Sequence, residues 1–599
     1  MQKLFEKNIK YLYNNLPHYY SLITTIKKKR FLIKNNNIFD TLTNSFLYPN
    51  SIEEDSIIFA TNPINNSLYD KYFTFVEPKK WEEKFYITGK IINKLIEKAN
   101  RLSHTDRFYF DKNFLPTTII YGLMAGKHID LLVENYEFQS LLIYEPNIEF
   151  FAISLYFMDL EKIYKKLGER FFIQIGGNLS EEIIQKFLNE RVVTSSFLQL
   201  ELTTYYHPII ENAKKKFDEF RNTKLRGWGT YEDEMIGIKN HKRNINKYPI
   251  LKYSKNLNIP FCIVANGKSL EKNIEFIKKN KNSMIIVSVG TALKPLLKAG
   301  IESDFHIEQE RIELLIEALR EILPQYNGIF IGANVVNPKV FEMAKNPYMY
   351  IREGFTFERF YPRPLIFSSP LVGNTGVSFA ANFTKEIYLC GMDLGFRLGE
   401  KKHSKNSFYD NEEDIQTEGI KIKGNFSNDI YTDSLLLSSK QMLEKLIKIK
   451  NLTVYNLSDG AFIEGTIPIK DKSLLQNINK EKIKEEILSS FVNEEFQEIA
   501  PNIYPLLNAI SHAFKQLNIK DYKHLTGVID FLEDLINSYA KKDSSAYSLL
   551  RGSLWHILLH FYILSHKLQN KKDISKLAQL LRKEIYSIEK QFKKDYFGY

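Results

Sequence analysis

The sequence predicts an α/β protein in three parts. An N-terminal α/β domain spans residues 1–222, a linker residues 223–258, a central α/β domain residues 259–469 and a C-terminal helical bundle residues 470–599. Two observations predict this division. Apolar, strand-like runs alternate with helix-like stretches in the first two domains, which is typical of a mostly parallel sheet with right-handed crossovers. Beyond the central domain only helical spacing of apolar residues remains.

Length and composition agree with several globular domains. The chain has 599 residues, and a domain usually holds roughly 100 to 200. Hydrophobic residues make up 44% and charged residues 26%, a balance that excludes a largely disordered or collagen-like polymer. The net charge is 82 − 71 = +11, without a run of five or more basic residues. We therefore expect anionic ligands rather than a nucleic-acid partner.

Cysteines and apolar segments indicate a reducing compartment. The only two cysteines, Cys262 and Cys390, are each flanked by apolar β-forming residues and are expected to be buried, reduced thiols. This excludes a disulfide scaffold and a thiolate zinc site. The charged start of the chain has no apolar core of a signal peptide. Because Arg551, His556 and His560 interrupt the longest apolar stretch, we expect a buried helix rather than a membrane span, and a cytoplasmic protein.

In the N-terminal domain the clearest unit is a helix near residues 130–135, a strand over residues 140–144 and a helix over residues 148–159. The strand ends in Glu145, and a carboxylate at that place often accepts hydroxyl hydrogen bonds in nucleotide-binding folds. The more ordinary interpretation is that Glu145 caps the following helix. Residues 121–126 lack the glycine spacing of a dinucleotide loop, so no cofactor is predicted here.

The remaining elements follow in order. The linker is polar and predicts a connecting helix. Strands of the central domain are expected at residues 261–265, 283–289, 304–307, 328–331 and 386–390, with a helix over residues 270–279. Helices of the bundle are expected at residues 481–491, 504–516, 521–539, 547–568 and 573–592.

The first candidate site is the turn Asn266-Gly-Lys-Ser-Leu270 after the first central strand. Gly267 permits a tight turn, Ser269 can cap the helix, and free N–H groups at a helix start attract phosphate. A nucleotide-hydrolysing P-loop needs a glycine where Cys262 stands, which excludes that class. The alternative is a capped helix without a ligand.

The second candidate lies at residues 371–378, where Gly373 and Gly376 bracket Asn374 and Thr375. Such a helix start offers backbone and side-chain donors to a base, a ribose or a phosphate. The alternative is that the small residues permit close packing of a helix on the sheet.

The third candidate is the strand over residues 387–390 that ends in Gly-Met-Asp393, followed by a polar loop with His403-Ser-Lys-Asn406. Ligands of open α/β sheets bind outside the carboxyl ends of the strands, so all three candidates can converge on one crevice. His403 is a proton acceptor if its loop folds over that crevice, and is otherwise merely solvated.

These motifs, in this order and at these separations, resemble the bacterial sialyltransferases that use CMP-sialic acid. Over more of the chain they resemble the Maf motility-associated factors, which glycosylate flagellin; the run over residues 292–304 is also similar. The resemblance implies an N-terminal α/β domain, a central Rossmann-like domain of the sialyltransferase type (a GT-A variant) and a helical C-terminal domain.

The resemblance also implies roles for individual residues. His403 corresponds to the general base. Donor-binding residues are implied at Asn266, Gly267, Ser269, Gly290, Thr291, Gln309, Asn374, Thr375 and Gly376. No metal and no cofactor other than the CMP-activated donor sugar are expected, since no Asp-x-Asp pair follows a strand of the central domain.

The sequence departs from the sialyltransferase pattern at two places. Lys268 stands where those enzymes have proline, and no pair of tyrosines follows Asp393 to bind the donor phosphate. Candidates to replace them are Lys268, Arg397, Lys401, Lys402 and Tyr409.

The implied function is an inverting, metal-independent transfer of pseudaminic or legionaminic acid from its CMP donor to Ser/Thr hydroxyls of flagellin, required for flagellar assembly and motility. Because the phosphate-binding tyrosines are missing, a second interpretation is a flagellin-binding escort with a vestigial nucleotide pocket. A third is a pterin diphosphokinase, since distant relatives of the central domain are so described. The lack of an acidic metal-binding pair counts against the third.

Overall fold

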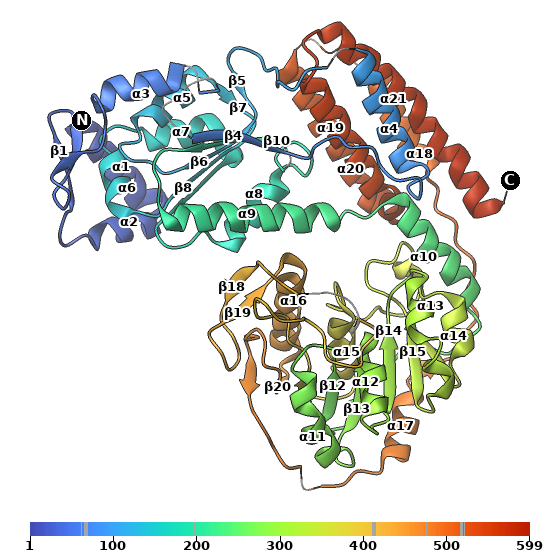
Figure 1. The fold of residues 1–599 in the computed structure, drawn as a ribbon. Coiled ribbons are helices and arrows are strands. Elements are labelled where there is room, and N and C mark those ends of the chain that lie inside the picture. Colours follow the sequence, from blue (N-terminus) through green and yellow to red (C-terminus); the bar gives the residue numbers. More distant parts are fainter. Residues whose placement is uncertain are drawn as a thin grey trace.

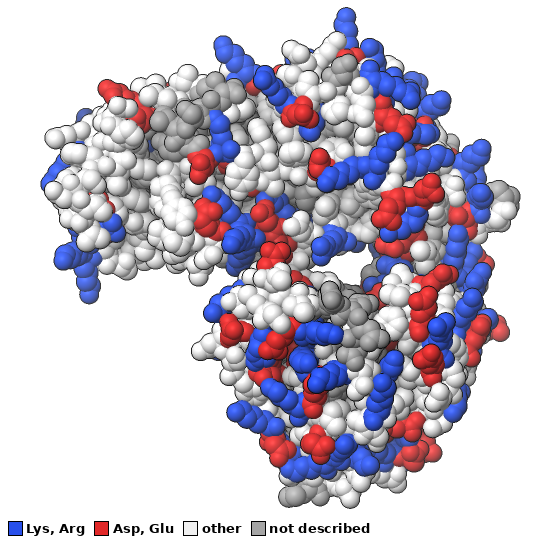
Figure 2. Space-filling model, viewed as in Figure 1, with Lys and Arg blue, Asp and Glu red and all other residues white. Residues whose placement is uncertain are grey.

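The computed structural model describes residues 1–61, 63–64, 70–102, 104–196, 198–409, 415–474, 476–515, 519 and 521–598. It confirms the α/β class with a helical C-terminal region. In Figure 1 the N-terminal domain and the C-terminal helices lie side by side, and the central domain lies below them. On the face shown in Figure 2, Lys and Arg side chains are interspersed with Asp and Glu. The positive excess is therefore spread over this face rather than gathered in one patch.

The N-terminal domain is built on a five-stranded sheet in the order β4-β10-β6-β8-β9. Only β4 runs antiparallel to its neighbour, and β6 and β8 are buried along their whole length, as apolar parallel strands are. The strands are β4 (Asp70–Phe75), β6 (Thr117–Tyr121), β8 (Leu141–Glu145), β9 (Phe171–Ile175) and β10 (Leu198–Thr203). The strand that ends in Glu145 and the helix near residues 130–135 are confirmed.

Two local predictions in this domain are wrong. The helix after β8, α6 (Ile148–Ser154), ends before residue 159, because Asp159 caps a new helix, α7 (Leu160–Leu167), by accepting a bond from the Lys162 N–H. Glu145 does not cap α6; the Asn147 side chain does, at 2.9 Å from the Glu149 nitrogen. The fully buried Glu145 carboxylate faces the loop after β6 instead.

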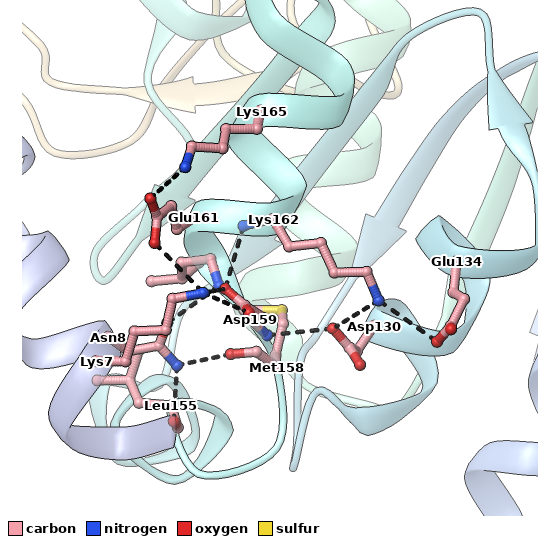
Figure 3. Close-up of polar contacts among 11 residues, drawn as sticks. Lys7, Asn8, Asp130, Glu134, Leu155, Met158, Asp159, Glu161, Lys162 and Lys165 are labelled. Carbon is pink, nitrogen blue, oxygen red and sulfur yellow. Dashed lines mark hydrogen bonds and ion pairs between the residues drawn. The ribbon is translucent and has the colours of Figure 1, made fainter. Parts of the chain in front are cut away.

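The first helix, α1 (Gln2–Asn15), is fixed to this domain by a buried asparagine (Figure 3). The Asn8 Nδ2 group donates to the carbonyl oxygens of Leu155 and Met158, at 2.8 and 2.7 Å, and Asn8 Oδ1 accepts from the Leu160 nitrogen at 3.1 Å. All these polar groups lie at the turn between α6 and α7, where the backbone would otherwise lack partners. The Asn8 side chain thus supplies the hydrogen-bond partners that these backbone groups would otherwise find in a helix or a sheet.

A small antiparallel sheet and α3 (Ile52–Thr61) cover the carboxyl end of the N-terminal sheet. The strands of this sheet are β1 (Phe31–Lys34), β2 (Asn37–Asp40) and β3 (Ser45–Phe46). The main helices around the larger sheet are α5 (Lys127–Asn135), α8 (Glu181–Glu190) and α9 (Pro208–Arg226).

The central domain is a ten-stranded sheet in the order β21-β20-β17-β12-β13-β14-β15-β16-β11-β22, parallel except for β22. The expected strands are confirmed as β12 (Phe261–Val264), β13 (Ile285–Val289), β14 (Phe305–Glu308), β15 (Ile329–Ala333) and β17 (Glu386–Cys390). The others are β16 (Pro347–Tyr350), β20 (Thr453–Asn456), β21 (Thr466–Pro468), β11 (Ile250–Leu251) and β22 (Phe491–Val492). The last two lie outside residues 259–469, so the sheet extends beyond the expected domain limits on both sides.

The C-terminal helices confirm the expected bundle, but it has an additional member. Helix α4 (Thr88–Arg101), from the N-terminal region, packs against α20 and α21 (Figure 1). The bundle helices are α18 (Tyr504–Lys515), α19 (Tyr522–Lys542), α20 (Ser544–His566) and α21 (Lys571–Phe592). The prediction that the helix at residues 481–491 belongs to the bundle is wrong: α17 (Lys480–Leu488) lies near the central domain, where Lys480 pairs with Asp304 at 2.6 Å. The apolar stretch around His556 is a buried helix, as expected. Among the described helices, none combines the length and the apolar character of a membrane span.

The expected linker is largely helical. Helix α9 continues past residue 222, and α10 (Tyr231–Asn244) follows. The Glu232 carboxylate accepts bonds from the backbone nitrogens of Ile87 and Thr88, both at 2.8 Å, at the start of α4. These contacts fix α10 to the bundle.

Candidate functional site

A pocket opens at the carboxyl edge of the central sheet, between β12 and β17. The chain leaves β12 toward β13 on one side and leaves β17 toward β20 on the other, so this is the point where the strand order reverses. Crevices at such points are the usual ligand sites of open α/β sheets. The pocket encloses about 180 Å³. It is lined by residues 265–267, 289–291, 371–373, 391–395, 402–403 and by Leu436.

Asn266 holds three of these segments together. Its Nδ2 group donates to Thr291 Oγ1 at 2.7 Å, and its Oδ1 accepts from the Ser404 hydroxyl at 2.5 Å. The Gly267 nitrogen donates to the Gly391 carbonyl at 2.8 Å, and a Cβ at Gly267 would lie 2.5 Å from Asp393 Oδ2. The turn therefore requires glycine at this position because of close approach. Of the residues expected here, Asn266, Gly267, Gly290 and Thr291 all line the pocket.

Ser269 has a different role from the expected one. Its side chain does not cap α11 (Leu270–Asn280). Instead its backbone N–H donates to Asp393 Oδ2 at 2.9 Å, and its hydroxyl makes a short hydrogen bond to Asp393 Oδ1. Burial raises the pKa of Asp393 to about 6, although both Ser269 bonds favour the carboxylate. Asp393 lines the pocket; it ended the third candidate motif, but no role was predicted for its side chain.

The His403 loop folds over the pocket. Gly267 and His403 form an antiparallel bridge, and the Lys268 nitrogen donates to the Lys402 carbonyl at 3.0 Å. The imidazole is half-buried and stacks on the Tyr409 ring, with 4.9 Å between centroids and 28° between planes. The condition set for His403 as a proton acceptor, a loop that covers the crevice, is therefore met.

Helix α15 (Val372–Ala380) points its first turn into the pocket, through Leu371, Val372 and Gly373. The backbone N–H groups of a first helical turn lack partners within the helix and carry partial positive charge. The second candidate segment thus reaches the pocket through residues 371–373, one residue earlier than the expected Asn374.

The side chains expected from α15 and its neighbour point elsewhere. Asn374 exchanges hydrogen bonds with Ser439 on α16 (Ser434–Lys450), at 2.8 and 2.5 Å. Thr375 donates to Gln309 Oε1 at 2.7 Å, and Gln309 Nε2 donates to the Pro370 carbonyl at 2.9 Å. All three side chains are fully buried outside the pocket lining. A Cβ at Gly376 would lie 2.6 Å from Val289 Cγ1, so the packing alternative describes this glycine.

The candidates for phosphate binding separate into two groups. Lys268 pairs with Glu271 at 3.0 Å and Arg397 with Asp459 at 3.1 Å, both outside the pocket lining. Lys402 lines the pocket, pairs with Asp433 at 2.8 Å and lies 4.8 Å from the Phe396 ring centre. Lys402 is thus the cation nearest to the first turn of α15 in this lining.

Comparisons with known proteins agree with this architecture. Residues 4–224 match the family described as the glycosyltransferase Maf N-terminal domain, and residues 237–399 match the family described as 6-hydroxymethylpterin diphosphokinase MptE-like. The structure of Maf glycosyltransferase from Magnetospirillum magneticum AMB-1 is similar, with a TM-score of 0.69 and 20% identity over 99% of this chain and 97% of that chain. No curated protein gives a significant match.

The match to the glycosyltransferase Maf N-terminal domain supports a glycosyltransferase. The chain carries the Maf N-terminal domain followed by an MptE-like domain, and the resemblance to the Maf family noted in the sequence is confirmed.

Proposed function

We propose that this glycosyltransferase transfers a sialic-acid-like nonulosonic acid, pseudaminic or legionaminic acid, from its CMP donor to Ser or Thr hydroxyls of flagellin. The transfer inverts the anomeric centre, needs no metal ion and takes place in the cytoplasm, as a step required for flagellar assembly and motility. One observation carries the proposal: the half-buried His403 lies in one pocket with Asn266, Gly290 and Thr291, so that three separate segments of the chain meet there.

The departing phosphate of CMP would face the first turn of α15. Backbone N–H groups and the helix dipole stabilise negative charge there, and Lys402 adds a full positive charge. Donors fixed in place before the reaction stabilise charge that develops in the transition state. Because the pocket encloses about 180 Å³, it would hold one part of the donor, and the rest would extend past the loops.

His403 would act on the acceptor. As the hydroxyl oxygen forms its bond to the anomeric carbon, the bond between that carbon and the phosphate oxygen breaks, and CMP leaves with the electron pair. The hydroxyl proton passes to the imidazole. A general base of this kind contributes about 10²- to 10⁴-fold in rate. Asp393 is a positioning residue, because it holds the Asn266 to Ser269 turn through two bonds to Ser269.

Co-expression with flagellin and a source of CMP-nonulosonate tests the proposal. Intact-mass measurement should show added sugar mass on flagellin with the wild type. With His403→Ala no sugar mass should be added, while flagellin binding stays intact. His18→Ala, on the exposed surface of α2 (Pro17–Thr24), is the matched control and should act like the wild type. Equal modification by His403→Ala would remove this residue from the mechanism.

Two other functions can be distinguished from sugar transfer by experiment. Flagellin that binds well but gains no mass would favour the escort, whose nucleotide pocket is vestigial. The MptE-like match over residues 237–399 favours a pterin diphosphokinase as a second enzyme activity. Incubation with ATP and 6-hydroxymethylpterin, followed by detection of AMP, distinguishes that activity from sugar transfer.

A further inference from the structure

The N-terminal domain has its own pocket at the carboxyl edge of its sheet. The chain leaves β6 toward β8 on one side, while β10 follows on the other side of β6, so the strand order reverses between β6 and β10. The pocket encloses about 500 Å³, within the usual range of small-molecule sites. Its walls include Met124 after β6 and residues 204–207 after β10, and the β1 to β3 sheet covers it. Like the central pocket, this pocket lies at the carboxyl edge of a sheet, at the point where the strand order reverses.

Aromatic rings form much of the wall. Phe150 lies between Phe31, with 4.5 Å between ring centroids, and Tyr205, at 5.2 Å. Tyr206 stands at the rim with 78% of its surface exposed. Ring faces carry negative charge density and attract the positively polarised C–H groups of a saturated ring. The rings of Phe31, Phe150 and Tyr205 are held in place by their mutual contacts, so a ligand need not order them.

The charged side chains of the wall are paired or buried. Arg30 forms a paired bond with Asp40, at 2.8 and 2.6 Å, and Asp55 is held by Asn50 at 2.7 and 3.0 Å. One cation and two carboxylates line the pocket, which gives a net charge of −1. Because Asp40 matches the charge of Arg30, the one Arg of this lining is not an unpaired cation for a phosphate or carboxylate ligand, whereas ligand hydroxyls can bond to the polar side chains of the wall.

The loop after β6, where a phosphate would bind in a nucleotide fold, is already occupied. Glu145 accepts hydrogen bonds from the Leu123 nitrogen at 2.5 Å, the Asn147 nitrogen at 2.7 Å and the Tyr205 hydroxyl at 2.5 Å. The protein's own carboxylate thus takes the place of an anion at this loop. Met124, next in the loop, has a positive φ of 46°, a strained conformation for a side chain that lines a pocket.

We infer that the pocket between β6 and β10 binds a neutral, polyhydroxylated sugar. The rings contact the C–H faces of the sugar, and Arg30, Asp40, Asn147 and His207 are polar groups on the wall that can bind its hydroxyls. This site lies in a different domain from the His403 pocket and does not depend on the proposed transfer reaction. A sugar on the acceptor protein, or on a neighbouring glycan, has the hydroxyl groups and C–H faces that the pocket can bind.

Saturation-transfer NMR on the full-length protein tests the inference. The probes are glucose, galactose, N-acetylglucosamine and N-acetylgalactosamine, compared with N-acetylneuraminic acid and tetramethylammonium, each measured without CMP and again in excess CMP to fill the central pocket. At least one neutral sugar should bind, with a Kd of about 1 mM. Binding by the anionic or cationic probe alone, or by none, would overturn the inference, as would a sugar signal that excess CMP abolishes.

The exposed rim tyrosine allows a variant that leaves the fold intact. Tyr206→Ala should weaken neutral-sugar binding about fivefold through loss of a ring contact. Tyr13→Ala, with 65% of Tyr13 exposed on α1 of the same domain, is the matched control and should leave binding unchanged. Sugar binding that is equal in Tyr206→Ala and wild type would show that the sugar binds elsewhere. The flagellin mass assay is independent of these outcomes, so either proposal can fail alone.

Discussion

The two α/β domains have the same kind of carboxylate contact at the carboxyl edge of their sheets. In each, a carboxylate at the end of one strand binds the loop that follows the neighbouring strand: Asp393 binds Ser269 after β12, and Glu145 binds Leu123 after β6. Burial raises the pKa of both carboxyls, to about 6 and about 7. The shared device therefore belongs to the scaffold, and it does not distinguish the two pockets.

What differs is the cover over each edge. The central pocket is covered by the His403 loop and the first turn of α15, which supply an imidazole and a helix N-terminus. The N-terminal pocket is covered by the β1 to β3 sheet and by Tyr206, which supply rings and an Arg30–Asp40 pair. If both proposals hold, the segments inserted above a sheet set the ligand chemistry, while the sheet sets only the location of the pocket.

The largest expected effect tests the shared carboxylates. Glu145→Gln should remove a pH dependence of stability worth roughly 3 kcal/mol, and Asp393→Asn one of similar size. The ordinary pKa values are 4.5 and 3.8, and the folded values are about 7 and about 6. At a pH between the ordinary and the folded pKa, each carboxyl keeps a proton in the folded protein that it has released in the unfolded chain. The free energy of unfolding of the wild type therefore falls as pH rises through this window.

Chemical unfolding at several pH values between 4 and 7 measures this slope. Each variant should show a shallower fall than the wild type. Glu275→Gln, at a side chain that is 84% exposed, is the control and should keep the wild-type slope. The same pH slope for all four proteins would mean that neither carboxylate is protonated in the folded state. The similarity between the two domains would then make no contribution to the pH dependence of stability.

The next effect separates scaffold from ligand contact in the central domain. Asn374→Ala should lower the free energy of unfolding by about 2 kcal/mol, because it leaves the buried Ser439 carbonyl and hydroxyl without their partner. CMP affinity of the folded variant should stay close to that of the wild type. Calorimetric titration with CMP checks this. A strong loss of CMP affinity with unchanged stability would restore Asn374 to the donor site.

The smallest effect concerns the charge at the central pocket. Lys402→Met should weaken CMP binding about tenfold, through loss of one positive charge near the phosphate. Lys268→Met removes a lysine that pairs with Glu271 outside the lining, and it serves as the matched control with little change. Titration of both variants with CMP and with cytidine checks the effect, since cytidine carries no phosphate. Equal losses for the two ligands would argue against a phosphate contact of Lys402.

Much of the central domain followed from the sequence. The strand that ends at Cys390 and the helix that begins at Leu270 were predicted to within a residue, because apolar runs bounded by glycine and polar residues report buried parallel strands directly. The convergence of Asn266, Thr291 and His403 was expected from the resemblance and from the rule for carboxyl ends of strands.

The errors have one physical cause, which is that partners distant in sequence decide where a side chain points. Asn374 faces Ser439, and Thr375 faces Gln309, through contacts that no local spacing reveals. The same holds for α4, whose place in the C-terminal bundle depends on Glu232 of α10. The N-terminal pocket was missed because its cover comes from residues 30–55, far from the strands that it covers.

A crystal structure of the protein with CMP tests the central claim most directly, because it shows which carboxyl edge takes the nucleotide. We predict CMP density between β12 and β17, with the phosphate at the first turn of α15 and near Lys402, and no nucleotide beside Tyr206. Density for CMP in the N-terminal pocket, or at neither edge, would contradict the account.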